Sequence, residues 1–328
     1  TFPPGYLDEI GLGYSVLREL NPGLILTSIT PFGQTGPYRD FAGSDLVAQA
    51  MGGLMYLAGF PEDPPHKLHG SQAYHSASVQ AAVGTMMALY TRELTGRGQQ
   101  VDVSLQESVL MALETAMQHY DLRKEIRRRT SREQPVVPGI GLYPCKDGHI
   151  WSYVVAGAGA GWEVILDWME SEGMAGDLKD PKWAEVFELM GNFRALVALA
   201  NDPPALMARL EQFAHINEIV EAFLMKHTKR EIFEAAAPRR IMMVPVQSPK
   251  DILENPQLQA LGYFVDVEHP ELGTTIKYPG APYYHISDAP WRISRRAPLI
   301  GEHNSDIYEK ELGLSKEQLA VLKQEGAI

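Results

Sequence analysis

The stretch from Thr85 to Leu105, TMMALYTRELTGRGQQVDVSL, joins a helix pattern, a glycine turn and a strand pattern. The helix pattern extends back to Ala73 and contains many small side chains, so neighbouring backbone can approach closely and we expect a buried helix. The turn from Thr95 to Gln99 holds two glycines, which end helices because they accept unusual backbone dihedrals. Apolar and polar residues then alternate over Val101–Leu105, which is typical of a strand.

The segments around this stretch continue with helices and strands. Tyr14–Leu20 has helical spacing and stops at Asn21-Pro22-Gly23, because proline lacks the N–H that a helix needs. Leu24–Ile29 is an apolar-rich run typical of a buried parallel strand. Further helices are predicted at Ser44–Leu54 and, after the capping-box pattern Ser104-x-x-Glu107, as far as Tyr120.

The composition changes in the middle of the chain after a basic run. The run consists of Arg123, Lys124, Arg127, Arg128, Arg129 and Arg132, and a stretch rich in proline and glycine follows it. We expect a domain boundary here, and the cations suit a partner subunit, ligand phosphates or solvent. Beyond it, Leu142–Trp151 is predicted to form a hairpin that turns at Asp147-Gly148, and Ser315-x-x-Gln318 is predicted to cap a final helix.

The composition also limits the partners and the compartment. The net charge of −12 argues against nucleic acid, which requires a concentrated cationic surface. The single cysteine, Cys145, excludes an intramolecular disulfide and suits the reducing cytoplasm, where we expect the protein. The sequence contains neither an apolar run of about 18 residues nor a signal-peptide pattern, so no membrane partner is expected.

Three motifs carry a resemblance to a known family. They are Thr85–Leu105, Ser28–Tyr38 (SITPFGQTGPY) and Pro298–Asn304 (PLIGEHN). With these motifs the chain resembles, from end to end, the class III coenzyme A-transferases (CaiB/BaiF, formyl-CoA transferase-like). The resemblance implies an α/β fold with a parallel-sheet, Rossmann-like large domain over residues 1–135 and a smaller α+β domain over 136–285. Residues 286–328 are expected to return to the large domain, and two chains are expected to interlock as a dimer.

The start of the chain matches the middle of the family's large domain. Thr1–Gly5 corresponds to a mid-domain segment of the relatives. Roughly the first hundred residues of a usual member, which hold its first βαβ units, are therefore expected to be absent here. Either the chain is a fragment of a longer protein, or another subunit supplies these units.

The main departure from the family lies at its nucleophile. Members use an aspartate to attack the acyl-CoA thioester, because a carboxylate is ionised at neutral pH and yields a reactive anhydride. Counting from Val47–Ala50 and from the Thr95-Gly96 turn places Tyr74 at this position, and residues 64–92 contain no Asp or Glu. A phenol with a pKa of about 10 is neutral at pH 7, so we expect Tyr74 to line or pack a degenerate site rather than to attack.

Asp45 and His75 are the other catalytic candidates. His75 is expected either to act as a base, as a histidine does in the racemase branch of the family, or to be a structural group. Asp45 matches an acidic family position that faces the acyl-CoA, where it would orient substrate or replace the nucleophile. An acid at the start of a helix is also favourable for the helix dipole alone.

The resemblance also assigns the contacts with coenzyme A. Gly33 and Gly36 match a loop beside the pantetheine arm, where glycine lets backbone approach a ligand. Phe2, Pro3 and Ile10 match positions at the adenine end. A CoA thioester is expected as substrate, with no tightly bound cofactor. No metal is expected, because His-Glu and Cys-x-x-Cys patterns are missing.

The predicted function is transfer of CoA between an acyl-CoA and a small organic acid. The chain would act as a homodimer, or as the aspartate-free subunit of a heteromer with a related chain that carries the aspartate. Two alternatives remain open on the sequence. One is a CoA-thioester racemase or isomerase that uses His75 or Asp45 as a proton shuttle. The other is a non-catalytic homologue that binds CoA or serves as a scaffold.

Overall fold

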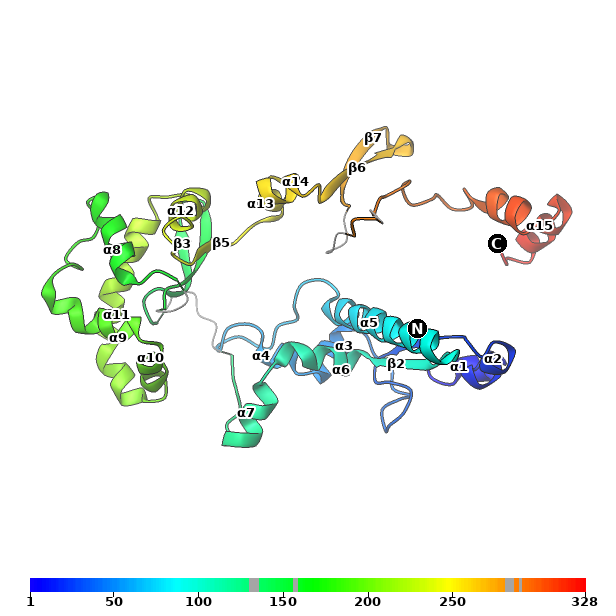
Figure 1. Ribbon diagram of the computed structural model, residues 1–328, viewed down its shortest axis with the longest axis horizontal. Helices are drawn as coiled ribbons and strands as arrows, with labels where there is room; N and C mark the ends of the chain where they lie inside the picture. Colours follow the sequence, from blue (N-terminus) through cyan, green and yellow to red (C-terminus); the bar gives the residue numbers. More distant parts are fainter. Residues whose placement is uncertain (130–135, 156–158, 281–285, 289–290) are drawn as a thin grey trace. The chain divides into compact units, whose positions relative to one another are not determined.

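The computed structural model describes residues 1–129, 136–155, 159–280, 286–288 and 291–328 (Figure 1). The chain divides into two compact units, Thr1–Met243 and Val244–Ile328. The first unit holds two apolar clusters that share no residue. The expected domain boundaries at 135/136 and 285/286 each involve a residue, 135 or 285, that lies outside the described residues.

The first elements of the chain pack around a parallel pair of strands. β1 (Leu26–Thr30) pairs with β2 (Gln100–Ser104), with Leu26 opposite Gln100 and Thr30 opposite Ser104. The predicted parallel strand is therefore confirmed. The helices of this part are α1 (Tyr6–Glu9), α2 (Tyr14–Leu20), α3 (Asp45–Met51), α4 (Leu54–Leu57), α5 (Gln72–Thr95), α6 (Leu105–Leu110), the short η1 (Met111–Leu113) and α7 (Ala116–Arg123).

The turn between α5 and β2 depends on its two glycines. Gly96 follows α5 with a φ of 70°, in the left-handed region that glycine adopts at little cost. A Cβ at Gly98 would lie 1.8 Å from the carbonyl oxygen of Leu24, so no larger residue fits. The N–H of Gly98 donates to the carbonyl of Pro22 at 2.8 Å. This close approach brings the start of β2 beside the start of β1.

Helix α5 is buried along one face only. Ala73, Ala77 and Ala81 belong to the first apolar cluster, which also contains Ala48, Val103, Leu105 and Val109. The opposite side of the helix carries exposed apolar side chains, namely Val79, Val83, Met86, Met87, Tyr90 and Leu94. The expectation of a buried helix therefore holds for the small-residue face and not for the whole surface.

The helix predicted after β2 is interrupted. Ser104 caps its start by accepting the N–H of Glu107 at 3.3 Å. Glu114, however, has a φ of 49° and separates α6 and η1 from α7. Three residues of α6 are buried, whereas each residue of α7 retains solvent exposure. The prediction of one helix to Tyr120 was wrong because the helical pattern continues across a point where packing against the core ends.

The second apolar cluster joins a hairpin to a group of helices. β3 (Ile140–Cys145) and β4 (Gly148–Tyr153) pair antiparallel with Cys145 opposite Gly148, which confirms the predicted hairpin, and β5 (Met243–Pro245) adds a third strand beside β4. The helices are α8 (Trp162–Ser171), η2 (Pro181–Trp183), α9 (Ala184–Gly191), α10 (Phe193–Ala200), α11 (Pro203–Leu224) and α12 (Lys229–Ala236) (Figure 1). Large buried side chains such as Tyr143, Phe213 and Phe223 make this the larger of the two cores.

The second unit contains short helices and one hairpin among its described residues. Its elements are α13 (Pro249–Leu253), α14 (Pro256–Ala260), β6 (Phe264–His269), η3 (Pro270–Leu272), β7 (Thr274–Pro279), the π-helical η4 (Ser305–Glu311) and α15 (Lys316–Gln324). β6 and β7 pair antiparallel, with Phe264 opposite Pro279. Ser315 and Gln318 form the predicted capping box, in which each side chain accepts the backbone N–H of the other residue.

Candidate active site

Asp45 joins the start of α3 to the start of α5. It is the first residue of α3, it is 7% exposed, and its Oδ1 accepts the N–H groups of Ala73 at 2.8 Å and Tyr74 at 3.4 Å. The first N–H groups of a helix have no partner within the helix, and a carboxylate also meets the positive end of the helix dipole. Asp45 therefore caps α5, although it lies 28 positions before Ala73.

The second oxygen of Asp45 is bound by side chains. Oδ2 accepts a hydrogen bond from the Gln49 amide at 2.7 Å and lies 3.3 Å from Nζ of Lys67. Gln49 is fully buried, and its Oε1 accepts the N–H of Leu68 at 3.0 Å. Burial raises the pKa of Asp45, but the hydrogen bonds from Ala73, Gln49 and Lys67 outweigh burial and hold that pKa below its ordinary value of 3.8. Asp45 is thus an ionised carboxylate with four donors at neutral pH.

Tyr74 and His75 lie in the first turn of α5, next to this carboxylate. Both residues are exposed, Tyr74 to 43%. The bond from Tyr74 to Asp45 uses its backbone N–H and not its phenol. The three candidate catalytic residues therefore lie around one helix start, where Asp45 is engaged in hydrogen bonds and the side chains of Tyr74 and His75 are open to solvent.

Gln49 and Lys67 belong to this arrangement but were not among the residues predicted from the sequence. Gln49 carried a signal, because an amide in the mainly apolar stretch Leu46–Met51 requires hydrogen-bond partners when the helix is buried. Lys67 carried none. It comes from the connection between α4 and α5, and only the tertiary fold brings its ammonium to Asp45.

The loop after β1 is held in place by β1 and β2. Gly33 has a φ of 91°, and its N–H donates to Oγ1 of Thr30 at 3.0 Å. The N–H of Gln34 donates to the carboxylate of Asp102, on β2, at 2.8 Å. Gly36 also has a positive φ, of 90°. Both glycines of the predicted pantetheine loop therefore occupy backbone conformations that other residues adopt only with strain.

A pocket of about 410 Å³ lies beside this loop. Its lining includes Phe2, Pro3 and Gln34, together with residues of α2 and β1. Of the predicted coenzyme A contacts, Phe2 and Pro3 line the pocket. The other three, Ile10, Gly33 and Gly36, do not line it. Arg18 of α2 also lines the pocket, and sequence reasoning did not single it out.

The described residues contain no group of three His, Cys, Asp or Glu side chains that could hold a metal ion. His66, near Tyr74 in sequence, lies 3.4 Å from the carboxylate of Asp63. In the described parts of the chain, no helix is both long enough and apolar enough to span a membrane.

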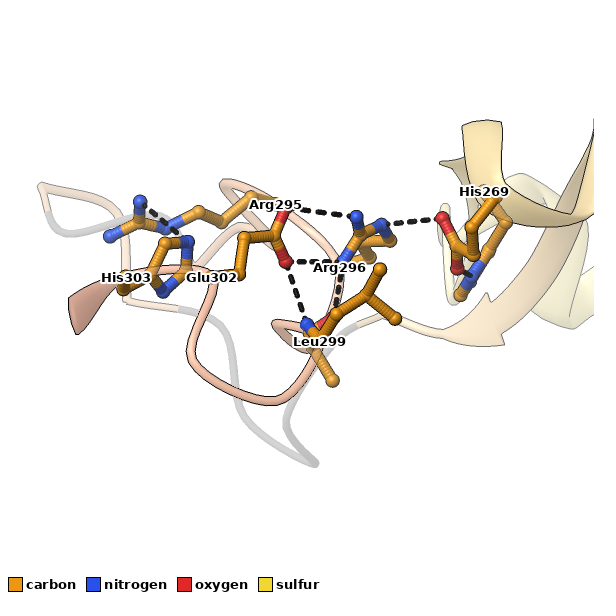
Figure 2. A network of polar contacts seen from close by, with 8 residues as sticks. His269, Arg295, Arg296, Leu299, Glu302 and His303 are labelled. Atoms are coloured by element: carbon orange, nitrogen blue, oxygen red, sulfur yellow. Dashed lines mark hydrogen bonds and ion pairs between the residues drawn. The ribbon is translucent and has the colours of Figure 1, made fainter. Parts of the chain in front are cut away.

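Ion pairs hold the closing motif Pro298–Asn304 within the second unit (Figure 2). Glu302 accepts two bonds of 2.9 Å from the guanidinium of Arg296 and the N–H of Leu299 at 2.7 Å. The bonds from Arg296 lower the pKa of Glu302. Nε of Arg296 also lies 2.8 Å from a carboxylate oxygen of Glu271. Arg296 is thus shared between two carboxylates.

The same network reaches the end of β6. Nδ1 of His269 lies 2.8 Å from Glu271, and this hydrogen bond lowers the pKa of Glu271 (Figure 2). Arg295 and His303, whose side-chain nitrogens are 3.4 Å apart, line a pocket of about 400 Å³ in this unit. The closing motif therefore has a local structural basis, since Glu302 closes the turn that contains it.

Comparison with known proteins relates the whole chain to one family. The profile of CoA-transferase family III matches residues 1–304. The succinyl-CoA:(R)-benzylsuccinate CoA-transferase subunit BbsE of Thauera aromatica is 36% identical over 307 residues, which cover 93% of this chain and 70% of that protein. The succinyl-CoA–D-citramalate CoA-transferase of Chloroflexus aurantiacus is 32% identical over 330 residues, which cover all of this chain and 75% of that protein.

A solved structure shares the fold. The crystal structure of a CaiB/BaiF family protein from Brucella suis superposes with a TM-score of 0.73 at 24% identity, and the match covers 94% of this chain and 73% of that one. The mixed α/β architecture is therefore that of CaiB/BaiF proteins. From the extent of the profile match and the identity to curated relatives, the chain belongs to CoA-transferase family III.

Proposed function

We propose that this chain binds a CoA thioester and works as the aspartate-free subunit of a CoA-transferase for a small organic acid. A related chain supplies the nucleophilic carboxylate. The observation that carries this proposal is the start of α5, where an exposed phenol, Tyr74, stands at the position to which the flanking motifs assign the family's aspartate. The carboxylate beside it, Asp45, already accepts four hydrogen bonds or ion pairs and is held in its ionised form.

The pocket beside the Gly33 loop supports binding of the nucleotide end of CoA. Phe2 offers an aromatic face, and stacking on aromatic side chains is a general way to hold a base. Arg18 places a guanidinium in the same pocket, and arginine suits phosphate because its planar fork donates two parallel hydrogen bonds. This combination is the reason to assign the pocket to a nucleotide rather than to a simple acid.

The proposed transfer conserves every group. A carboxylate oxygen attacks the thioester carbonyl carbon, and the C–S bond breaks. CoA is released as the thiolate, and the acyl group stays on the enzyme carboxylate as a mixed anhydride. The thiolate attacks the enzyme's acyl carbon, which releases the first acid and forms an enzyme-bound thioester. The acceptor acid attacks this thioester, and the released thiolate then attacks the acceptor's carbonyl carbon, which restores the enzyme carboxylate. Tyr74 performs none of these steps, because a neutral phenol is a poor nucleophile and its acyl ester is less reactive than an anhydride.

The assembly follows from the same proposal. A heteromer fits the resemblance to BbsE, which is named as a subunit, and an interlocked pair of chains is the arrangement that we expect. We assign residues 1–135 to a Rossmann-like large domain, 136–285 to the small domain and 286–328 to the return segment. The cytoplasm is the expected location, in keeping with the free and buried Cys145.

The test is to restore the carboxylate. Tyr74→Asp is expected to let the isolated chain capture CoA from succinyl-CoA as a covalent thioester, which hydroxylamine traps and mass spectrometry locates at residue 74. Wild type and Tyr74→Asn, which has nearly the same shape as aspartate but no nucleophilic oxygen anion, are the matched controls and should give no adduct. Tyr90→Asp introduces a carboxylate at another exposed position of α5, 16 residues further along and on a different side of the helix, and should also give none.

Two outcomes contradict the proposal. An adduct on the wild-type chain alone would show that this subunit is catalytically complete. Exchange of the α-proton of an acyl-CoA into deuterated water by the wild-type chain, without transfer, would assign it instead to the racemase or isomerase class.

A further inference from the structure

We infer that Arg129 is a positioning residue that fixes the connection between α4 and α5 and so holds Lys67 and Leu68 at the start of α5. This inference rests on the proposed function in one respect, namely that the acyl end of the substrate lies beside Tyr74. The placement of the connection itself follows from contacts in the structure. Arg129 lies toward the end of the basic run, and its role there is to bind backbone.

The guanidinium of Arg129 donates to three backbone carbonyls. Nη1 donates to Tyr56 at 2.9 Å, Nε to Phe60 at 3.0 Å and Nη2 to Asp63 at 3.1 Å. Its central carbon also lies 6.0 Å from the ring centre of Tyr56, a cation–π distance. All three nitrogens of one side chain are thus used on one segment, Tyr56–Asp63, that lies 66 to 73 positions earlier in the chain.

This geometry suits arginine and not lysine. The guanidinium is planar and rigid, so three carbonyls that converge on it are held in one fixed relation. An ammonium is a single point charge on a flexible stem and cannot reproduce that fork. Among the residues that the structure describes, no carboxylate pairs with Arg129, so the carbonyl dipoles and the Tyr56 ring are what balance its charge.

The segment that Arg129 binds leads directly into the candidate site. Four residues after Asp63, Lys67 reaches Asp45, and the N–H of Leu68 donates to the buried Gln49. Residues 58–71, all of which the structure describes, contain no helix or strand. The connection is therefore held at two places, by Arg129 near its start and by Asp45 and Gln49 near its end. Loss of the Arg129 contacts is expected to weaken the contacts of Lys67 with Asp45 and of Leu68 with Gln49, because no helix or strand between the two places stiffens the backbone.

The consequence is a selective effect on the acyl end of the substrate. The connection ends just before Tyr74, whereas the pocket assigned to the nucleotide is lined by Phe2, Pro3 and Arg18, from a different part of the chain. Loss of Arg129 should therefore weaken binding of an acyl-CoA and leave binding of free CoA nearly unchanged. A general loss of folding would weaken both ligands together.

The experiment compares Arg129→Ala with Arg127→Ala, which removes an exposed cation from the same run. Hydrogen exchange at the Leu68 amide should accelerate at least about tenfold in Arg129→Ala, in line with the loss of hydrogen bonds from a charged donor, and less than about twofold in Arg127→Ala. Calorimetric titration should give a Kd for succinyl-CoA that rises about tenfold in Arg129→Ala while the Kd for CoA changes less than about twofold.

Arg129→Lys separates geometry from charge. In this variant the Leu68 amide is expected to exchange its hydrogen much faster than in wild type. If Arg129→Ala fails to fold, Arg129→Lys still tests the role of Arg129. Wild-type protection of Leu68 in both Arg129 variants would overturn the inference, and so would an equal loss of affinity for CoA and succinyl-CoA. If wild type binds neither ligand, the proposed function fails, while Leu68 exchange still decides the role of Arg129.

Discussion

Four donors converge on the carboxylate of Asp45. Two of them are backbone N–H groups at the start of α5, where the helix itself supplies no acceptor. A hydrogen bond to a charged group contributes more to stability than a neutral one, and a buried group that loses its partner costs its full desolvation. The charge of Asp45 therefore holds α3, α5 and the connection between α4 and α5 together.

Replacing this charge tests its structural role. Asp45→Asn keeps the shape but weakens the bonds from Ala73 and Lys67, and the free energy of unfolding is expected to fall by about 2 to 3 kcal/mol. Urea denaturation measures the change. Asp40→Asn, at a carboxylate exposed to solvent, should change it by less than about 0.5 kcal/mol. Equal effects of the two substitutions would contradict the capping role of Asp45.

The same residue predicts a dependence of stability on pH. The pKa of Asp45 is lower in the folded chain than its ordinary value of 3.8, so its contribution is fully present above pH 3.8. That contribution is lost as the pH falls through the folded pKa, because the unfolded chain takes up the proton more readily. In urea denaturation from pH 7 to about pH 3, wild type should lose stability more steeply at the acid end than Asp45→Asn. Parallel curves would show that Asp45 does not contribute.

At the scale of single elements, the loop after β1 owes its shape to glycine. Gly33→Ala is expected to cost about 1 to 2 kcal/mol, because a φ of 91° brings the Cβ into conflict with the backbone, and the new Cβ would also lie 3.4 Å from Asp102. Gly191, at the end of α9, serves as the control because a Cβ there would meet no atom within 4 Å. Gly191→Ala should be neutral or stabilise by up to about 1 kcal/mol.

Urea denaturation separates these two glycine variants, and titration with CoA adds a second measurement for Gly33→Ala. Since Gln34 lines the pocket assigned to the nucleotide, a shift of the loop should weaken CoA binding as well as stability. A Gly33→Ala protein as stable as wild type, with unchanged affinity, would mean that the loop conformation is not required.

At the scale of the whole molecule, the two apolar clusters of the first unit share no residue. Phe213 is completely buried in the larger cluster, and Phe213→Ala is expected to cost about 3 to 5 kcal/mol. Hydrogen exchange should accelerate in α8 and α11 but not in β2. Phe193→Ala, at a side chain that is 55% exposed, is the control. Equal acceleration in β2 would show that the two clusters unfold as one.

The local parts of the fold could be predicted from the sequence. The parallel strand β1, the hairpin β3–β4 and the capping box at Ser315 depend on neighbours within a few residues or on the pattern of one segment, and the structure contains all three. The break at Glu114 could not be predicted, because no glycine or proline marks it and it reflects where α7 leaves the core.

Only part of the candidate site could be predicted from the sequence. The resemblance to the family, matched position by position through its motifs, selected Asp45, Tyr74 and His75, and the structure places all three around one helix start. The roles of Gln49, Lys67 and Arg129 were not predictable, because their partners lie on other segments. A basic run gives no sign of which arginine turns inward to three carbonyls.

By itself the sequence determined the family and the absence of a carboxylate between residues 64 and 92. Both are properties of residue identity and order, which folding does not change. Only the tertiary structure decided that the nearby acid, Asp45, is occupied as the cap of α5, and that a distant arginine holds the connection leading to it. Hydrogen bonds act over about 3 Å, so their partners are known only when the chain has brought distant segments together.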